Sequence, residues 1–325
     1  MANEKDIQEF IVNANKIVKE INKDIIGQKD ILESTLITII AGGNILLEGV
    51  PGIGKTRLVK TLAKVLNMPF SRIQFTPDLM PADVTGTETL VKDESGNTRL
   101  QFQPGPIFSN IILADEINRA TPKTQSALLE AMQEHTVTVS GETMRLEEPF
   151  FVLATQNPIE QDGTYPLPEA QLDRFMMKLM VGSPSPEELK EIVKITQVTM
   201  EETANPVVSA EDILKMRNIA KEVLVADDVL NYTVKLITAT QPDSSMASKT
   251  AVKFLRFGSS PRGAQALITC AKVRALLKGR LNISYDDIDA LAYPVLRHRI
   301  KLNFEAITSK LSSDDIITEI IKEIK

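Results

Sequence analysis

The sequence predicts an α/β protein in which a parallel sheet between helices is followed by an all-α domain. Three observations lead to this prediction. Short, fully apolar runs, typical of strands buried on both faces of a parallel sheet, recur in the first half of the chain. Segments with apolar residues at helical spacing separate these runs, and only helical segments follow residue 183. Strands that alternate with helices form parallel sheets with right-handed crossovers.

The first half begins with two helices, which the apolar spacing places at about 6–22 and 28–41. Gly42-Gly43 is a stop signal for the second helix. The strands expected next are 45–47, a strand around Ile73 and Phe75, 111–114 and 150–154. The helices expected between them are 55–66 and 122–134. Two segments interrupt this alternation, and turn residues flanked by alternating runs indicate hairpins at 84–103 and 137–146.

The composition changes at Ser183-Pro184-Ser185-Pro186, which divides the chain into expected domains at 1–183 and 184–325. Helical spacing then predicts helices at about 187–203, 209–224, 227–240, 261–278, 284–292 and 313–324. The last helix carries an isoleucine stripe, which we expect to pack on the rest of its domain. For the basic run 297–301 we expect a solvated helix end, with a nucleic-acid contact as the alternative.

Composition excludes several classes of protein. The 325 residues are 43% hydrophobic with a net charge of −6, which is typical of a globular chain and makes nucleic acid an unlikely partner. A single cysteine, Cys270, and two histidines exclude a disulfide framework and a thiolate zinc cluster. We expect no signal peptide, because the N-terminus is charged, and no membrane span, because the uncharged run 34–47 is shorter than the roughly 20 residues that a span needs. We therefore expect a cytoplasmic protein without membrane insertion.

A phosphate-binding motif lies between the first expected strand and the helix at 55–66. The pattern G-x-x-x-x-G-K-[ST] is met in full by Gly49-Val50-Pro51-Gly52-Ile53-Gly54-Lys55-Thr56. Glycines let successive backbone N–H groups point inward around a polyphosphate, and the helix N-terminus adds its positive dipole end. Lys55 would bind the outer phosphates and Thr56 would bind Mg²⁺, with Arg57 next in the same helical turn. No N-K-x-D segment is present to recognise guanine, so we expect ATP with Mg²⁺.

Two carboxylates directly follow the buried strand at 111–114. In a phosphate-transfer site, Asp115 would hold Mg²⁺ through water and Glu116 would orient and deprotonate the attacking water. The alternative is a polar loop that merely begins with two acidic residues. Two adjacent carboxylates at the mouth of an apolar strand favour the catalytic interpretation.

Four blocks of the sequence together resemble the MoxR family of AAA+ ATPases. These blocks are Gly49–Thr56, Leu113–Ala120, Ala154–Pro158 and Leu167–Phe175, and they occur in order. The resemblance as a whole covers nearly the whole chain. The resemblance implies an AAA+ P-loop core with a helix-2 insert, followed by a helical lid domain. It also implies a ring of subunits, expected to be a hexamer.

The resemblance assigns further roles around the γ-phosphate. Asn157 would be sensor 1, since an amide can donate to phosphate and accept from water; a turn residue before proline is the alternative. Arg174 would be the arginine finger that reaches the ATP of the neighbouring subunit. The alternative for Arg174 is a surface arginine paired with Asp173 or Glu169, and Arg119 is a weaker rival for the finger role.

Other segments receive expectations from the same resemblance. Arg262 would be sensor 2 in the lid, and an arginine in a helix's first turn gains from a nearby anion because it opposes the dipole. Ile26 and Gly27 lie in a segment that would pack around adenine. Residues 84–103 would form the helix-2 insert and 137–146 the pre-sensor hairpin, both facing the pore of the ring.

The predicted function is ATP-driven remodelling of partner proteins, with von Willebrand factor A domain proteins as the partners that the family suggests. A nucleic-acid motor of the helix-2-insert group is the alternative, disfavoured by the net charge and by the lack of an added DNA-binding module. A nucleotide-sensing scaffold without catalysis is disfavoured because all the expected catalytic residues are present. The insert carries no aromatic pore loop, which weakens a comparison with threading unfoldases.

Overall fold

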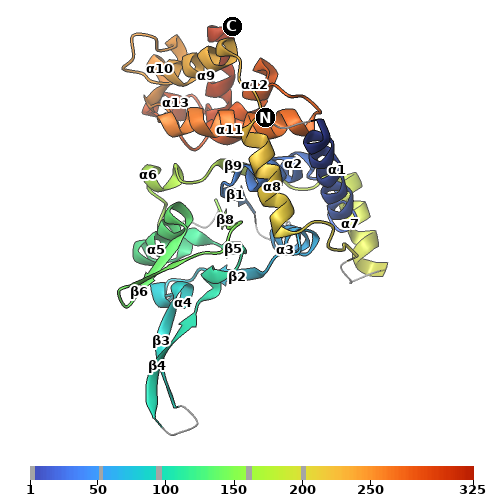
Figure 1. The fold of residues 1–325 in the computed structure, drawn as a ribbon. Coiled ribbons are helices and arrows are strands. Elements are labelled where there is room, and N and C mark those ends of the chain that lie inside the picture. The colour runs from blue at the N-terminus through green and yellow to red at the C-terminus, as the bar shows by residue number, and fades with distance from the viewer. Residues whose placement is uncertain (1–3, 51–53, 93–96, 159–162, 199–202) are drawn as a thin grey trace.

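A five-stranded parallel sheet lies at the centre of the computed structural model, which describes residues 4–50, 54–92, 97–158, 163–198 and 203–325 (Figure 1). The sheet order is β2-β5-β8-β1-β9, and each neighbouring pair is parallel. Its strands are β2 (Phe70–Gln74), β5 (Ile111–Asp115), β8 (Phe151–Gln156), β1 (Ile45–Gly49) and β9 (Met177–Val181). The predicted α/β fold class is therefore confirmed.

Alternating side chains of the strands build two cores, one on each face of the sheet. Ile45 and Leu47 belong to a cluster that includes α1 (Glu4–Ile21), α2 (Lys29–Ala41) and α3 (Lys55–Val65) and much of the second half of the chain. Leu46, between them, belongs to a second cluster that includes residues of α5 (Pro122–Glu134). Both faces of the central strands are thus covered by helices, as parallel sheets require.

Four helices of the first half fall close to the expected ranges, namely α1 (Glu4–Ile21), α2 (Lys29–Ala41), α3 (Lys55–Val65) and α5 (Pro122–Glu134). The short helices α4 (Pro81–Thr85) and α6 (Glu169–Leu172) were not predicted, nor were the 3₁₀ turns at Pro106–Phe108 and Ile117–Arg119. Gly42 ends α2 in the left-handed conformation, with its N–H bonded to the carbonyls of the last turn. The predicted stop signal acts as expected.

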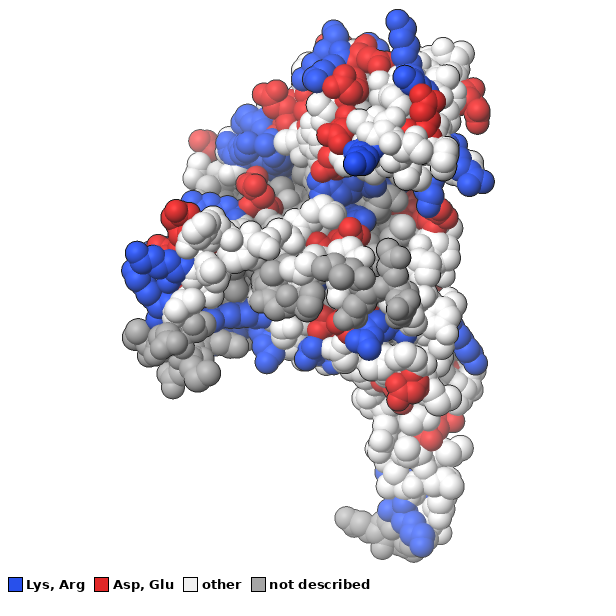
Figure 2. All heavy atoms as spheres, turned by 180° about the vertical axis from the view of Figure 1, so that it is seen from behind, with Lys and Arg blue, Asp and Glu red and all other residues white. Residues whose placement is uncertain are grey.

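Both predicted hairpins are present. The first, β3 (Gly86–Lys92) with β4 (Thr98–Pro104), pairs only with itself and extends away from the body as an arm (Figure 1). In the space-filling view the arm is a narrow column whose described surface is largely uncharged (Figure 2). At its base, the close approach of Gly86 and Gly105 leaves no space for a Cβ atom at either residue. The second hairpin is β6 (Thr136–Val139) with β7 (Glu142–Arg145).

The helices of the second half are α7 (Pro186–Val198), α8 (Ala210–Lys221), α9 (Asp227–Ala239), α10 (Lys249–Phe254), α11 (Pro261–Leu277), α12 (Tyr285–Leu296), α13 (Phe304–Thr308) and α14 (Ser313–Ile324), and we refer to them together as the lid. Of these, α9 to α13 gather at the end of the molecule opposite the arm, whereas α7 and α8 lie at the level of α1 and α3 (Figure 1). The isoleucine stripe of α14 is buried against the lid, as predicted, and Cys270 is buried in α11. Within the described ranges, none of the helices is long and apolar enough to span a membrane.

Other elements also differ from the expectations, including the short helices α10 and α13, which were not predicted. The edge strand β9 was not predicted, although it pairs with β1 along its whole length. The second half is not purely helical, because β10 (Leu255–Phe257) pairs with β11 (Lys301–Leu302). Strand β2 ends at Gln74, so Phe75 lies just beyond it, bonded through its N–H to the carbonyl of Asp115.

Candidate functional site

The phosphate-binding motif and the acidic pair meet at one edge of the sheet. Gly49 ends β1, Asp115 ends β5, and Asn157 directly follows β8. Parallel strands bring their carboxyl ends to the same edge, which is where α/β sheets bind ligands. Pro51, Gly52 and Ile53 of the motif lie outside the described residues.

Gly54 and Lys55 open the helix that follows the motif. Gly54 adopts a left-handed conformation with φ of 83°, and open space surrounds the position where a Cβ would be. The Lys55 ammonium donates to the carbonyl of Gly49 at 2.7 Å. Burial lowers the pKa of Lys55, while the nearby carboxylates of Asp115 and Glu116 act in the opposite direction. The lysine therefore lies close enough to the acidic pair to interact with its charges, beside the first turn of α3, whose N–H groups lack helical partners.

Asp115 is held by two neighbouring strands. Its Oδ1 accepts a hydrogen bond from the Thr155 hydroxyl at 2.6 Å, and its Oδ2 accepts from Arg72 at 2.6 Å. Arg72 is half-exposed on the edge strand β2, so this arginine can move without disturbing the core. The carboxylate is fixed on one side by a buried threonine and on the other by a movable cation.

Glu116 adopts a left-handed conformation with φ of 56°, which turns its side chain out of the strand direction. Its N–H donates to the Thr155 hydroxyl at 2.8 Å. Its Oε2 accepts from the Gln74 amide at 2.9 Å and from Arg119 at 3.0 Å. In this arrangement Arg119 is engaged by Glu116 of the same chain.

The donor set at this edge suits Mg²⁺. Thr56 offers a hydroxyl in the first turn of α3 and Asp115 a carboxylate, and Mg²⁺ prefers such oxygen ligands together with water and phosphate oxygens. Among the described residues, no group of three or more His, Cys, Asp or Glu side chains could hold a metal ion. A metal held jointly by these two residues and a nucleotide fits the site better than a cage made by protein alone.

Polar contacts also fix the segment expected at adenine. Gly27 has φ of 70°, and a Cβ there would meet the carboxylate of Glu188 at the start of α7. Asp24, just before it, accepts from the N–H groups of Thr203 and Ala204. Burial alone would raise the pKa of Asp24, but these bonds and the charge of Arg57 outweigh it and lower the pKa. Ile26 and Gly27 thus lie in a segment tied both to α3 and to the lid.

Asn157 is buried, with 7% of its surface exposed, rather than lying in an open turn. Its position directly after β8 places it at the same sheet edge as Asp115. The sensor role of Asn157 stays a prediction from the sequence.

Arg174 lies at the opposite edge of the sheet, the one formed by the amino ends of the strands. It precedes β9, whose first residue, Met177, is in register with Ile45, the first residue of β1. Its guanidinium donates to the carbonyl of Leu129 in α5 at 2.7 Å. The alternative pairing with Asp173 or Glu169 is therefore not what the structure shows.

Arg262 lies near this second edge as well. The anion beside it is Asp173, with 3.8 Å between guanidinium nitrogen and carboxylate oxygen, and the Ser260 hydroxyl donates to the same carboxylate at 2.9 Å. The expected anion near the first turn of α11 is thus present, but it is a side chain next to Arg174.

The prediction of a solvated helix end for the basic run 297–301 is wrong. His298 is buried, and the side chain of Arg299 is only 3% exposed. Arg299 can be buried because Asp173 pairs with it and backbone carbonyls accept its remaining N–H groups.

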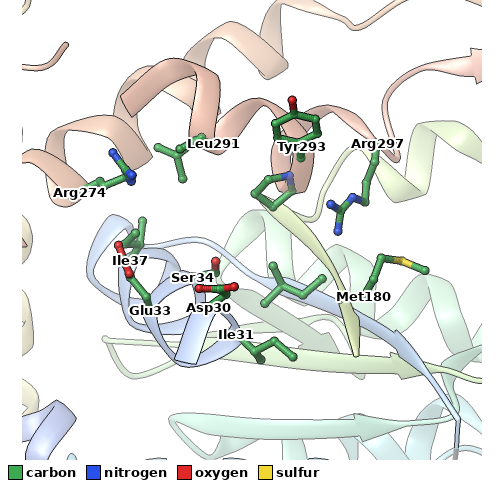
Figure 3. A pocket seen from close by; sticks show the side chains of 13 residues that line it. Asp30, Ile31, Glu33, Ser34, Ile37, Met180, Arg274, Leu291, Tyr293 and Arg297 are labelled. Atoms are coloured by element: carbon green, nitrogen blue, oxygen red, sulfur yellow. The ribbon is translucent and has the colours of Figure 1, made fainter. Parts of the chain in front are cut away.

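A cavity of about 480 Å³ lies elsewhere, between α2, β9 and the lid helices α11 and α12. In Figure 3, Asp30 and Glu33 of α2 lie across from Arg274 and Arg297 of the lid. Arg274 is already paired with buried Asp287, and Arg297 with Asp314. None of the residues expected to bind nucleotide lines this cavity, which is a space at the junction of core and lid.

Comparison with known proteins agrees with this architecture. Residues 44–177 match the model of the ATPase family associated with various cellular activities (AAA), and residues 248–320 match the AAA lid domain. Chaperone MoxR1 of Mycobacterium tuberculosis is 40% identical over 95% of this chain and 81% of its own length. The chain belongs to the MoxR family of AAA ATPases.

Two further relatives cover nearly all of this MoxR-family chain. The uncharacterized protein YeaC of Bacillus subtilis is 43% identical over 100% of the chain and 97% of its own length. A crystal structure of a candidate ATPase from Cytophaga hutchinsonii has a TM-score of 0.92 at 40% identity, covering 99% of this chain and 97% of that one. The resemblance to MoxR proteins is confirmed, and with it an ATPase that binds nucleotide.

Sequence reasoning missed three polar residues of the site: Arg72, Gln74 and Thr155. Arg72 and Gln74 alternate with buried Ile73 on β2, so they share one face of the edge strand. Thr155 follows Ala154, which is paired with Ala114 directly before Asp115. Polar residues at these positions of apolar strands were a visible signal, but their contacts depend on which strands are neighbours.

Proposed function

We propose that this MoxR-family ATPase assembles into a hexameric ring and hydrolyses ATP, with Mg²⁺, at sites that neighbouring subunits share. The free energy of ATP hydrolysis would be used to remodel partner proteins. The relative from Mycobacterium tuberculosis is named a chaperone, which supports this class of activity. A cytoplasmic location stays a prediction from the sequence.

The observation that carries the shared site is the separation of its parts within one chain. The acidic pair and Lys55 lie at the carboxyl edge of the sheet, whereas Arg174 precedes β9 at the amino edge. Four residue steps from Ile45 to Gly49, at about 3.3 Å each, separate the two edges by about 13 Å. An arginine at the amino edge is therefore better placed to serve a neighbour's nucleotide than its own.

In the proposed mechanism, Lys55 and the N–H groups at the start of α3 bind the phosphates of ATP. Thr56 and Asp115 would hold Mg²⁺, which when bound neutralises charge on the phosphate oxygens. Asn157 orients the γ-phosphate and the attacking water from the end of β8. The neighbour's Arg174 offsets the charge that develops in the transition state, and its Arg262 approaches from the same side.

Glu116 accepts the proton of the attacking water in this mechanism. Its carboxylate now accepts hydrogen bonds from Gln74 and Arg119. Both bonds fall on Oε2, so they hold the carboxylate in one orientation while the lone pairs of Oε1 can accept a hydrogen bond from the attacking water.

The arm formed by β3 and β4 is the part of the chain best suited to contact a partner. Leu90 and Leu100 face each other across its strands and are 73% and 62% exposed. Exposed apolar pairs on an otherwise unpaired hairpin indicate a protein-binding surface. We assign the arm, the helix-2 insert of this fold, to partner proteins, with von Willebrand factor A domain proteins as the proposed class.

Complementation tests the shared site. Lys55→Ala should lose ATP binding, and Arg174→Ala should bind ATP but hydrolyse it poorly, so each variant alone is inactive. Rings assembled from both variants contain some interfaces where an intact Lys55 faces an intact Arg174, so activity should return. Native mass spectrometry would verify that both subunits share one ring. The matched control is Arg145→Ala on the exposed hairpin β6–β7, which should hydrolyse ATP like the wild type. Mixed rings without activity would contradict the shared site.

A further inference from the structure

The basic run of the lid, residues 297–301, meets the segment that carries Arg174. Arg297 donates to the carbonyl of Lys178 at 3.1 Å, and the His298 ring lies 2.9 Å from the carbonyl of Phe175. Both of these backbone carbonyls lie within four residues of Arg174. The run is thus a feature of the sequence that nucleotide binding does not explain.

Arg299 makes the most extensive of these contacts. Its Nε donates to the carboxylate of Asp173 at 2.8 Å. Its other nitrogens donate to the carbonyls of Phe175 at 2.7 Å and Met176 at 3.0 Å. The planar guanidinium presents five donors in a fixed fork, which suits simultaneous bonding to a carboxylate and to successive carbonyls.

Asp173 joins this contact to the start of α11. The same carboxylate accepts from Ser260 at 2.9 Å and lies 3.8 Å from Arg262. The residue directly before Arg174 is therefore held by the lid from two directions. Arg174 itself points away, toward the carbonyl of Leu129 in α5.

The lid is attached to the core in other places, so attachment alone does not explain this concentration of bonds. Arg217 of α8 donates to carbonyls at the end of α2 and to the carboxylate of Glu148. Asp24 binds the chain at Thr203 and Ala204. Arg299 differs from these contacts because it fixes the backbone on both sides of the proposed finger.

We propose that Arg299 is a positioning residue for Arg174, and that through Asp173 it makes the finger and the lid move as one body. The inference rests on the proposed role of Arg174 in the neighbour's site. Rigid support of this kind matters because a displacement of about 1 Å in a catalytic group can reduce the rate about a hundredfold. A lid that shifts with the nucleotide state of its own subunit would then move the finger that serves the next.

The test is a complementation experiment with Arg299→Lys, which keeps the charge but cannot bond to Asp173, Phe175 and Met176 at once. We expect ATP affinity within about threefold of wild type and turnover at least tenfold lower. Co-assembly with Lys55→Ala should restore activity, because those subunits supply well-positioned fingers. Co-assembly with Arg174→Ala should restore none, because both subunits then lack a working finger. A merely structural defect would not separate these two mixtures.

Asp173→Asn provides a second variant that removes the ion pair with little change in volume, and it should behave like Arg299→Lys in both mixtures. Arg145→Lys on the exposed β6–β7 hairpin is the matched control and should keep wild-type turnover. If Arg299→Lys turns over within twofold of wild type, the inference fails. It also fails if Arg174→Ala is rescued by Lys55→Ala but Arg299→Lys is not. Should Lys55→Ala rescue neither variant, the shared site itself would be refuted.

Discussion

His298 should make the stability of this protein depend on pH between neutrality and mild acid. The ring is 7% exposed, and among the described residues its Nδ1 has no hydrogen-bond partner. Burial holds the pKa of His298 well below its usual value, and the charge of Arg299 adds to this effect. The bond to the Phe175 carbonyl acts in the opposite direction, and Lys178 and Arg297 lower the pKa further.

The sign and the size follow from proton linkage. The folded protein keeps His298 neutral, whereas the unfolded chain takes up a proton as the pH falls through about 6.5. The unfolded state then binds more protons, so the free energy of unfolding decreases as the pH decreases. At pH 5.5 the loss from this one group is about 1.4 kcal/mol relative to pH 7.5. Carboxylates with lowered pKa values, such as that of Asp24, act only below about pH 4 to 5.

Urea unfolding at pH 7.5, 6.5 and 5.5 would measure this effect. His298→Gln keeps an amide donor for the Phe175 carbonyl but does not titrate, so its free energy of unfolding should fall by about 1.4 kcal/mol less than that of wild type. The control is His135→Gln, at a half-exposed histidine that pairs with Glu148. Parallel pH profiles for wild type and His298→Gln would refute the reasoning.

Two further predictions concern the acidic pair. Glu116→Gln should keep ATP affinity within a few-fold while turnover falls by about 10²–10⁴, measured by calorimetry and phosphate release, because a general base contributes about that much. Turnover within tenfold of wild type would remove Glu116 from this role. Arg72→Ala should lower the Mg²⁺ concentration for half-maximal ATPase activity by about 1.4- to 5-fold, since a half-exposed ion pair contributes about 0.2–1 kcal/mol. An unchanged Mg²⁺ titration would show that Arg72 does not compete for Asp115.

The helices and the central strands could be predicted from the sequence because their signals are local. The apolar run at 111–114 predicts a buried strand, and the glycines at 42–43 predict the end of a helix. Each of these signals is contained within a few neighbouring residues. Strand β9 was missed because its residues alternate in burial but not in hydropathy: Met180 is apolar yet 49% exposed, so the sequence Met177–Val181 shows no clear period of two. Its pairing with β1 is a tertiary contact, because it depends on residues more than 120 positions earlier in the chain.

The same distinction explains the outcome at the site. Lys55, Thr56, Asp115 and Glu116 carry their chemistry in motifs that can be recognised in one stretch of chain. The environment of Arg299 cannot be recognised in this way, because its partners lie about 125 residues earlier, at Asp173 and beyond. A basic run is expected to be solvated unless distant carbonyls and a carboxylate surround it.

Strand β1 connects the two halves of the proposed catalytic unit. Its last residue, Gly49, accepts the hydrogen bond of Lys55, and its first residue, Ile45, is in register with the start of β9, three residues after Arg174. The proposed shared site thus has two structural connections between a subunit's own phosphate-binding motif and Arg174, one along β1 and β9 and one through the lid. If the lid path dominates, Arg299→Lys should leave ATP binding in its own cradle intact and still slow the neighbouring site. If the strand path dominates, breaking the lid contact should change neither, because paired strands would hold Arg174 in place alone.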